Sequence, residues 1–207
     1  MKKYILLSLM ITFSLESLSD GNSIFSKNAP GLVFLMTDTG TASGVIISNK
    51  GYVLTNWHAI DGVDVHESSI GLHWAYDLGE YENYLVKFEV IKFDKTKDLA
   101  LLKIINPPKN LKAIKISKVI PPIGSESHAI GHPNGEIWTY TKGYISQHRN
   151  NYEWQYEENG IKHIANVYQT QTPITEGNSG GPLLNSHGNL IGINTFGSKK
   201  FQALNYA

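Results

Sequence analysis

Short apolar runs separated by turn-forming residues fill the sequence from residue 31 onward. Most contain four to eight residues and are rich in Val, Ile, Thr and Tyr, whereas the breaks carry Gly, Pro, Asn and Ser. Beyond the first nineteen residues, helical periodicity is never kept for three turns, and at most one turn is expected at 58–60. This pattern predicts an all-β sandwich or barrel. The runs are LVFLM (32–36), GVIIS (44–48), YVLT (52–55), LALLKII (99–105), GEIWTYTKGYIS (135–146), HIANVYQTQT (163–172) and NLIGINTF (189–196).

Four prolines between residues 106 and 122 indicate a seam in the chain. A division there leaves halves of about 90 residues, a suitable size for two small barrels. We therefore expect one barrel over 20–112 and a second over 113–207. The aromatic and acidic segment 68–84 is expected as either a core hairpin or a projecting loop, and the sequence does not choose between them.

The balance of charge argues against two classes of partner. Eighteen basic and eighteen acidic residues leave no net charge, so neither nucleic acid nor an anionic membrane is expected to bind. The lysines of 109–118 alternate with apolar residues, which is typical of solvated strand faces. The chain contains no cysteine, so disulfides and thiolate metal sites are excluded.

The first nineteen residues have the organisation of a secretory signal peptide. Lys2 and Lys3 precede an apolar stretch over 4–15, and a small-x-small exit follows at 17–19. The apolar stretch is short for a bilayer span, although a retained membrane anchor is the alternative. We expect export, and the lack of cysteine favours the bacterial periplasm or exterior.

The segment TEGNSGGPLLN, residues 175–185, surrounds Ser179 with Gly177, Gly180 and Gly181. Glycine permits positive φ and close approach of the backbone, so this cluster indicates either a tight turn before a strand or a site where another group approaches the main chain. A serine hydroxyl becomes an effective nucleophile when a base takes its proton and a third group orients that base.

Candidate partners for Ser179 come from eight histidines and a few acids. His58 follows a strand-like run in VLTNWHAID, at the expected edge of a sheet. Asp98 directly precedes the most apolar run of the first half, where a carboxylate would need a partner or would cap the strand. His128 and His132 are four apart, but the intervening Ile-Gly and the following proline do not form a helix, so no paired metal site is expected.

The order of these residues along the chain discriminates among serine-enzyme classes. The α/β-hydrolase elbow requires an acid and a histidine after the serine, but no acid follows residue 179. A subtilisin order could use Asp38, but that fold needs helices that the sequence lacks. His58, Asp98 and Ser179 stand in the chymotrypsin order, which belongs to a double β-barrel.

Four segments in this order carry a family resemblance over most of residues 33–195. The chain resembles trypsin-like serine proteases and, more narrowly, their bacterial HtrA/Deg branch. The resemblance implies two six-stranded-type β-barrels, packed side by side with the active site in the cleft between them. It also implies Ser179 as nucleophile, His58 as general base and Asp98 as its orienting partner. The segments are TNWHAID, DLALLKI, GHPNGEIWTYTKGYIS and QTQTPITEGNSGGPLLNSHGNLIGINT.

Further roles follow from the same resemblance. The stretch 177–179, which includes Asn178, would form the oxyanion hole through the N–H groups of Gly177 and Ser179. Substrate would pair with the stretch Thr195, Phe196, Gly197, and the Thr195 hydroxyl would also reach Asp98. Ile174 belongs to the uncharged stretch 172–175, which would form one wall of the primary pocket. Asn194 lacks the imidazole of glutamate-specific relatives, so we expect a neutral, small or medium aliphatic side chain before the scissile bond.

Two departures from familiar relatives narrow these expectations. Asn178 stands where trypsins that mature by proteolysis carry an aspartate, so that activation switch is not expected. HtrA-type proteins often continue into a PDZ domain, whereas this sequence closes with FQALNYA, so peptide sensing by such a domain is not expected of this polypeptide.

The predicted function is an exported serine endopeptidase that forms an acyl-enzyme, needs no metal or cofactor, and acts on exported or misfolded polypeptides. A trimer-type homo-oligomer is implied only by resemblance. The alternative is a catalytically weak or inactive protein of protease fold that binds unfolded polypeptides.

Overall fold

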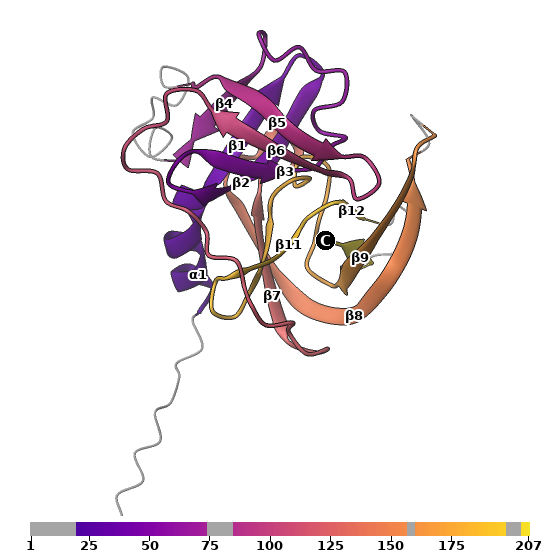
Figure 1. Cartoon of the computed structure of the whole chain (residues 1–207). Helices are drawn as coiled ribbons and strands as arrows, with labels where there is room; N and C mark the ends of the chain where they lie inside the picture. The colour runs from indigo at the N-terminus through magenta and orange to yellow at the C-terminus, as the bar shows by residue number, and fades with distance from the viewer. Residues whose placement is uncertain (1–19, 74–84, 157–159, 198–203) are drawn as a thin grey trace, which may run out of the picture.

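Two antiparallel sheets form the body of the chain (Figure 1). The computed structural model describes residues 20–73, 85–156, 160–197 and 204–207. The predicted signal peptide, residues 1–19, lies outside the described residues. Within the described part of the chain, no helix is both long and apolar enough to cross a membrane.

The first sheet contains six strands in the order β4-β1-β2-β3-β6-β5. Its inner faces follow the alternation expected of half-buried strands, as in β6, where every second residue is buried. The buried side chains, among them Val33, Ile46 and Leu102, form one aliphatic core with Trp57. The strands are β1 (Leu32–Thr37), β2 (Gly40–Ser48), β3 (Tyr52–Thr55), β4 (Ser69–Leu72), β5 (Phe88–Asp94) and β6 (Leu99–Ile104).

The second sheet contains seven strands in the order β11-β10-β7-β8-β9-β13-β12. Its longest strand, β8, has 17 residues and forms with β9 a curved hairpin that reaches towards the first sheet (Figure 1). The strands are β7 (Glu126–Gly131), β8 (Thr139–Gln155), β9 (Lys162–Thr170), β10 (Pro182–Asn185), β11 (Leu190–Ile193), β12 (Phe196–Gly197) and β13 (Asn205–Tyr206).

The all-β, double-barrel prediction is confirmed, although several elements were not anticipated. Strands β5, β7 and β13 lie outside the predicted runs, β4 falls in the segment left open between hairpin and loop, and β10 follows the glycine turn where a strand was one of two interpretations. Of segment 68–84, strand β4 lies at the edge of the first sheet against β1, and residues 74–84 lie outside the described part. The predicted run 135–146 begins too early, because Asn134 and Trp138 have φ values of 50° and 52° and only Thr139 starts the strand.

Helix α1 (Gly21–Asn28) was also not predicted. Its first turn is capped by Asp20, whose carboxylate accepts a hydrogen bond from the Ser23 N–H at 2.8 Å. Ile24 of this helix is fully buried in a second core cluster that contains Phe34 from β1 and Leu184 from β10. The helix therefore packs where the two halves meet. The short 3₁₀ turns are η1 (Ala29–Gly31) and η3 (Pro133–Gly135).

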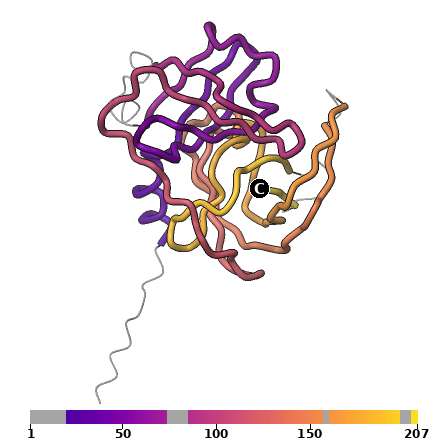
Figure 2. The backbone as a smooth tube through the Cα atoms, in the orientation of Figure 1, coloured from indigo at the N-terminus to yellow at the C-terminus, as the bar shows by residue number. Residues whose placement is uncertain are grey.

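The segment between the two sheets, residues 105–125, runs from β6 to β7 and is fastened to both halves (Figure 2). The Ile114 N–H donates to the Ile46 carbonyl of β2, and the Ser117 N–H donates to the Leu190 carbonyl of β11, both at 2.8 Å. A boundary between residues 112 and 113 stays a prediction.

Candidate active site

Asp98 and His58 form a hydrogen-bonded pair at one end of the first sheet. Asp98 lies directly before β6 with a left-handed φ of 55°, and its side chain is fully buried. His58 lies in the turn after β3, which the Ile60 N–H closes onto the Trp57 carbonyl at 2.9 Å. One Asp98 oxygen accepts from the His58 backbone N–H at 2.9 Å, and the other lies 2.7 Å from His58 Nδ1. When Nδ1 carries the proton, Nε2 keeps a lone pair and can act as a base.

Two further residues support Asp98, and the sequence analysis missed both. The buried Asn56 donates through Nδ2 to the Asp98 carbonyl at 3.0 Å and to Thr195 Oγ1 at 3.2 Å. Tyr156 donates its hydroxyl to Asp98 Oδ2 at 3.0 Å. Asn56 precedes His58 by two residues, so its place in TNWH was a usable signal. Tyr156 is 58 residues from Asp98, and nothing in the local sequence announces the contact.

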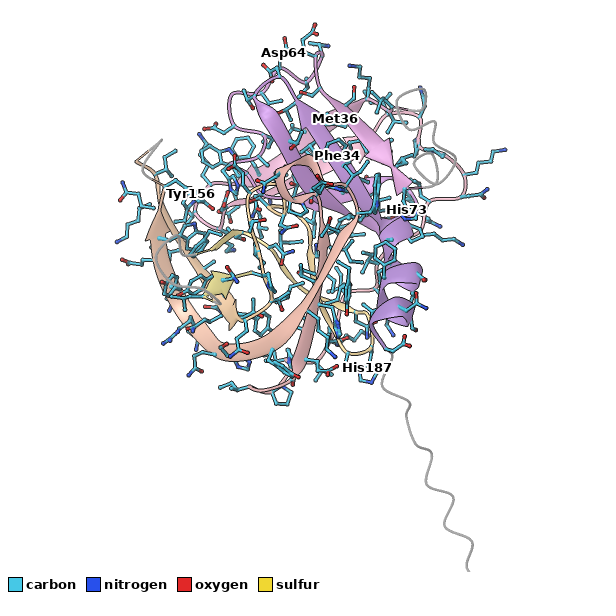
Figure 3. The ribbon with its side chains drawn as sticks, turned by 180° about the vertical axis from the view of Figure 1, so that it is seen from behind. Phe34, Met36, Asp64, His73, Tyr156 and His187 are labelled. Carbon is cyan, nitrogen blue, oxygen red and sulfur yellow. The ribbon has the colours of Figure 1, made fainter. Side chains whose placement is uncertain are left out.

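The expected contact between Thr195 and Asp98 is wrong. The Thr195 hydroxyl donates instead to the Ile193 carbonyl at 2.8 Å and accepts from Asn56. The hydroxyl that donates a hydrogen bond to Asp98 is that of Tyr156. Figure 3 shows Tyr156 where the far end of the β8–β9 hairpin meets the first sheet.

The loop that carries Ser179 requires glycine at defined positions. Gly177 and Gly180 have φ values of 89° and 83°, in the left-handed region that side chains rarely adopt. A Cβ at residue 177 would collide with the His132 carbonyl, and one at residue 180 would collide with the Ser43 carbonyl. The loop is therefore packed so closely that its backbone can adopt this conformation only with glycine at both positions.

The first sheet also holds this loop. Ser43 of β2 donates its hydroxyl to the Gly177 carbonyl and its backbone N–H to the Ser179 carbonyl, both at 2.8 Å. The Ser43 carbonyl in turn accepts from the Thr55 hydroxyl at 2.8 Å. Strand β2, which contributes neither His58 nor Asp98, thus fixes the position of the serine loop relative to the sheet that carries them.

The N–H groups of Gly177 and Ser179 have no acceptor among the described residues. The neighbouring Glu176 carbonyl accepts from the Asn134 N–H at 3.0 Å. Because a trans peptide points its N–H opposite to its carbonyl, this bond turns the Gly177 N–H away from Asn134. Oxyanion holes are built from backbone N–H groups of this kind.

The Ser179 hydroxyl donates to the Thr195 carbonyl at 3.2 Å. Within the described residues it forms no hydrogen bond with His58. The two are nevertheless linked: Asn56 binds both the Asp98 carbonyl and Thr195, and the Thr195 carbonyl receives the serine. The structure joins the aspartate and histidine directly and connects the serine to them through this chain.

The residues predicted to contact substrate lie beside the serine loop. Gly197 approaches Ile174 so closely that a Cβ at residue 197 would lie 3.0 Å from the Ile174 carbonyl. Asn205 of β13 donates to the Thr172 carbonyl at 2.9 Å and so connects β13 to the predicted pocket wall, residues 172–175. Phe196 stacks on Tyr206 with ring centroids 4.6 Å apart. Among the described residues, the groups that make these contacts are uncharged.

The remaining buried histidines have structural partners. His132 lies 3.1 Å from the Val33 carbonyl through Nε2 and accepts the Trp138 N–H at Nδ1, while burial lowers its pKa to about 3. The ring is neutral at physiological pH and ties β1 to the second half. His128 lies 2.7 Å from the Tyr140 hydroxyl, and its pKa is lowered mainly by burial and also by Lys142.

Two antiparallel sheets with a histidine–aspartate pair on one and a glycine-framed serine beside the other define the chymotrypsin-like double-barrel class. A trypsin-like peptidase domain model matches residues 42–193, and the chain belongs to this family. Its relatives confirm the predicted HtrA/Deg branch.

Protease Do-like 1 of Arabidopsis thaliana chloroplasts is 32% identical over 188 residues, covering 83% of this chain and 40% of that protein. Periplasmic serine endoprotease DegP of Escherichia coli is 37% identical over 161 residues, covering 74% of this chain and 29% of DegP. The chain therefore spans less than half the length of these curated relatives.

Solved structures agree with the fold. A serine endoprotease from Yersinia pestis superimposes with a TM-score of 0.71 at 29% identity, over 93% of this chain and 63% of that one. An inactive Ser-to-Ala protein from Mycobacterium tuberculosis superimposes with a TM-score of 0.73 at 18% identity, over 89% of this chain and 83% of that one. The second likeness concerns the fold alone.

Proposed function

We propose that the chain is a serine endopeptidase that cleaves polypeptides through an acyl-enzyme. The observation that carries this proposal is the hydrogen-bonded His58–Asp98 pair, which Asn56 and Thr195 link to the Ser179 hydroxyl. Among the described residues, the N–H groups of Gly177 and Ser179 have no acceptor and can serve as oxyanion donors. Such donors stabilise the negative charge that develops on a carbonyl oxygen, by about 3 kcal/mol each in comparable sites.

In the proposed reaction, the Ser179 hydroxyl leaves the Thr195 carbonyl and gives its proton to His58 Nε2 as Oγ attacks the scissile carbonyl carbon. The carbonyl oxygen becomes an oxyanion that accepts from Gly177 and Ser179. The C–N bond then breaks, His58 returns the proton to the leaving amine, and the acyl group remains on Ser179. Water, deprotonated by His58, hydrolyses that ester and restores the serine. Asp98 holds the imidazole and stabilises its positive charge throughout.

The natural substrates that we propose are exported or misfolded polypeptides, handled in the periplasm or outside the cell after removal of the leader. The name of DegP, a periplasmic serine endoprotease, supports the periplasmic location. The uncharged frame around Ile174 and Gly197 supports cleavage after a neutral, small or medium aliphatic side chain. A peptide-library profile dominated by Arg, Lys or Glu at that position would contradict this specificity. Assembly into a trimer belongs to the proposal by family resemblance.

A fluorophosphonate probe tests the proposal, because it reacts covalently only with an activated serine. We expect the wild-type chain to be labelled and S179A to remain unlabelled. Mass spectrometry of the tryptic peptide that contains residue 179 identifies the site. Equal labelling of both proteins would reject Ser179 as the nucleophile.

One observation favours a second candidate function, that of an inactive binder of unfolded polypeptides. The Ser179 hydroxyl is engaged with the Thr195 carbonyl and not with His58. In resting hydrolases, such hydrogen bonds are often long or misaligned and form only with substrate. Binding of a reduced, unfolded protein without any cleavage, together with no reaction with the probe, would favour the binder.

A further inference from the structure

We propose that Tyr156 is a positioning residue for the His58–Asp98 pair, brought across from the second half by the β8–β9 hairpin. This inference rests on the proposed function. It concerns the juxtaposition of one tyrosine hydroxyl with the buried carboxylate and of its ring with the imidazole.

The hairpin is fastened to the turn that carries Asp98. The Ile164 N–H of β9 donates to the Thr96 carbonyl at 2.7 Å, and His163 Nδ1 lies 2.7 Å from the Lys95 carbonyl. Ile161, just before β9, packs against the aliphatic core of the first sheet. Main-chain bonds and apolar contact therefore hold the end of the hairpin within reach of the β5–β6 turn.

At the carboxylate, Tyr156 completes a set of three donors. Asp98 Oδ1 accepts the His58 backbone N–H, whereas Oδ2 faces both His58 Nδ1 at 2.7 Å and the Tyr156 hydroxyl at 3.0 Å. The side chain of Asp98 is fully buried, so these protein donors take the place of water. Two donors on Oδ2 and one on Oδ1 fix the plane of the carboxylate, and with it the direction in which the imidazole is held.

The tyrosine ring acts on the histidine as well. Its centroid lies 4.9 Å from that of His58, with the planes inclined at 55°. The His58 side chain is 23% exposed, so it has room to swing towards solvent on one side. The tilted ring of Tyr156 covers another side and narrows that motion.

An aromatic stack packs along the end of the hairpin. Trp154 lies between His163 and Phe196, with centroids 5.2 and 5.1 Å away, and Phe196 continues to Tyr206 at 4.6 Å. Phe196 belongs to the stretch expected to pair with substrate. Tyr156 meets the edge of this stack at His163, with ring centroids 5.3 Å apart, and so joins the base and its acid to an aromatic scaffold that also supports this stretch.

The test compares Y156F with a matched control, Y152F, on the same strand. Tyr152 gives its hydroxyl to Tyr206 at 3.3 Å and stacks in the same scaffold, but it does not touch the His58–Asp98 pair in the described structure. A hydrogen bond to a buried charge typically changes rates by about tenfold to a hundredfold when lost. We expect Y156F to lower kcat on a fluorogenic peptide by this factor with KM within about twofold, and Y152F to retain kcat.

A spectroscopic readout separates positioning from general stability. The Nδ1 proton shared by His58 and Asp98 gives a downfield line in the proton NMR spectrum, assigned by its loss in H58Q. We expect Y156F to shift or broaden this line and Y152F to leave it in place. An unchanged line in Y156F, or equal loss of kcat in both variants, would overturn the inference. If the wild type hydrolyses nothing, the proposed function fails, yet the NMR comparison still decides the role of Tyr156.

Discussion

The two halves of the molecule prepare their parts of the site in different ways. In the first half, His58 and Asp98 are already joined at 2.7 Å, and the buried carboxylate receives one further donor, Tyr156, from the second half. In the second half, Ser179 is presented by a glycine-rich loop, and its hydroxyl is bound to a backbone carbonyl 3.2 Å away.

Because of this difference, different kinds of substitution should impair the two parts of the site. The acid–base pair depends on side-chain chemistry, because hydrogen bonds between polar and charged side chains hold His58 and Asp98 in place. The serine loop depends on backbone conformation, since glycines and contacts from Ser43 hold it. Changes of functional group should damage the first part, whereas an added methyl group should damage the second.

The largest effect is expected for D98N, which tests the side-chain half of the comparison. Asparagine has the same shape and tolerates the left-handed φ of 55°, so folding should be little affected. Its amide cannot hold the imidazole in the working tautomer, and kcat should fall about 10⁴-fold. Rates on a fluorogenic peptide measure this, with the melting temperature as control. A loss below about tenfold would mean that Asp98 does not orient His58.

Adding one methyl group in G177A tests the backbone half. The Cβ would meet the His132 carbonyl and displace one oxyanion donor, so kcat should fall about 10²- to 10³-fold. The matched control is G62A, because Gly62 has a similar φ of 72° but nothing within 4 Å of the added carbon. If both variants lose activity equally, left-handed strain and not the close approach is responsible.

Acid should lower the stability of the fold, because protonation of His132 disrupts its contact between β1 and the second half. The unfolded chain binds a proton below the ordinary histidine pKa of 6.5, whereas burial lowers the pKa in the folded chain to about 3. The free energy of unfolding therefore falls as the pH drops from 6.5 towards 3, by about 2 kcal/mol between pH 7 and pH 5 from this group alone.

Urea unfolding at the two pH values measures the acid effect. In H132Q, the slope of the free energy of unfolding against pH should fall by the equivalent of about one bound proton. His128, whose pKa is also lowered by burial, acts in the same direction and should keep a residual slope. A wild-type stability that does not change between pH 7 and pH 5 would contradict the assignment.

The smallest effect is expected for S43A, which removes the hydroxyl that the first sheet lends to the serine loop. Loss of its bond to the Gly177 carbonyl should lower the free energy of unfolding by about 1 kcal/mol and kcat several-fold. S68A removes another buried hydroxyl, which donates to the Asp64 carbonyl at 2.7 Å away from the serine loop. It should lower stability and leave kcat unchanged. A normal kcat in S43A would show that the serine loop keeps its position without the Ser43 hydroxyl.

The sequence alone determined the class of fold, the residues of the candidate triad and the glycines around the serine. These features are local: alternation along a strand such as β6, a turn signal beside His58, and glycine where φ is positive can be recognised within a few residues. Strand β5 is mostly exposed and β13 has only two residues, so neither carries a clear hydrophobic pattern.

The groups that surround the triad come into contact only in the folded molecule. Tyr156 reaches Asp98 across 58 residues, Ser43 reaches Gly177 across 134, and Asn56 reaches Thr195 across 139. Each of these contacts depends on how one sheet packs against the other, and a hydrogen bond at that separation leaves no periodic trace in the chain. The physical reason is that local sequence governs backbone conformation, whereas contacts between distant polar groups exist only once the two halves have docked.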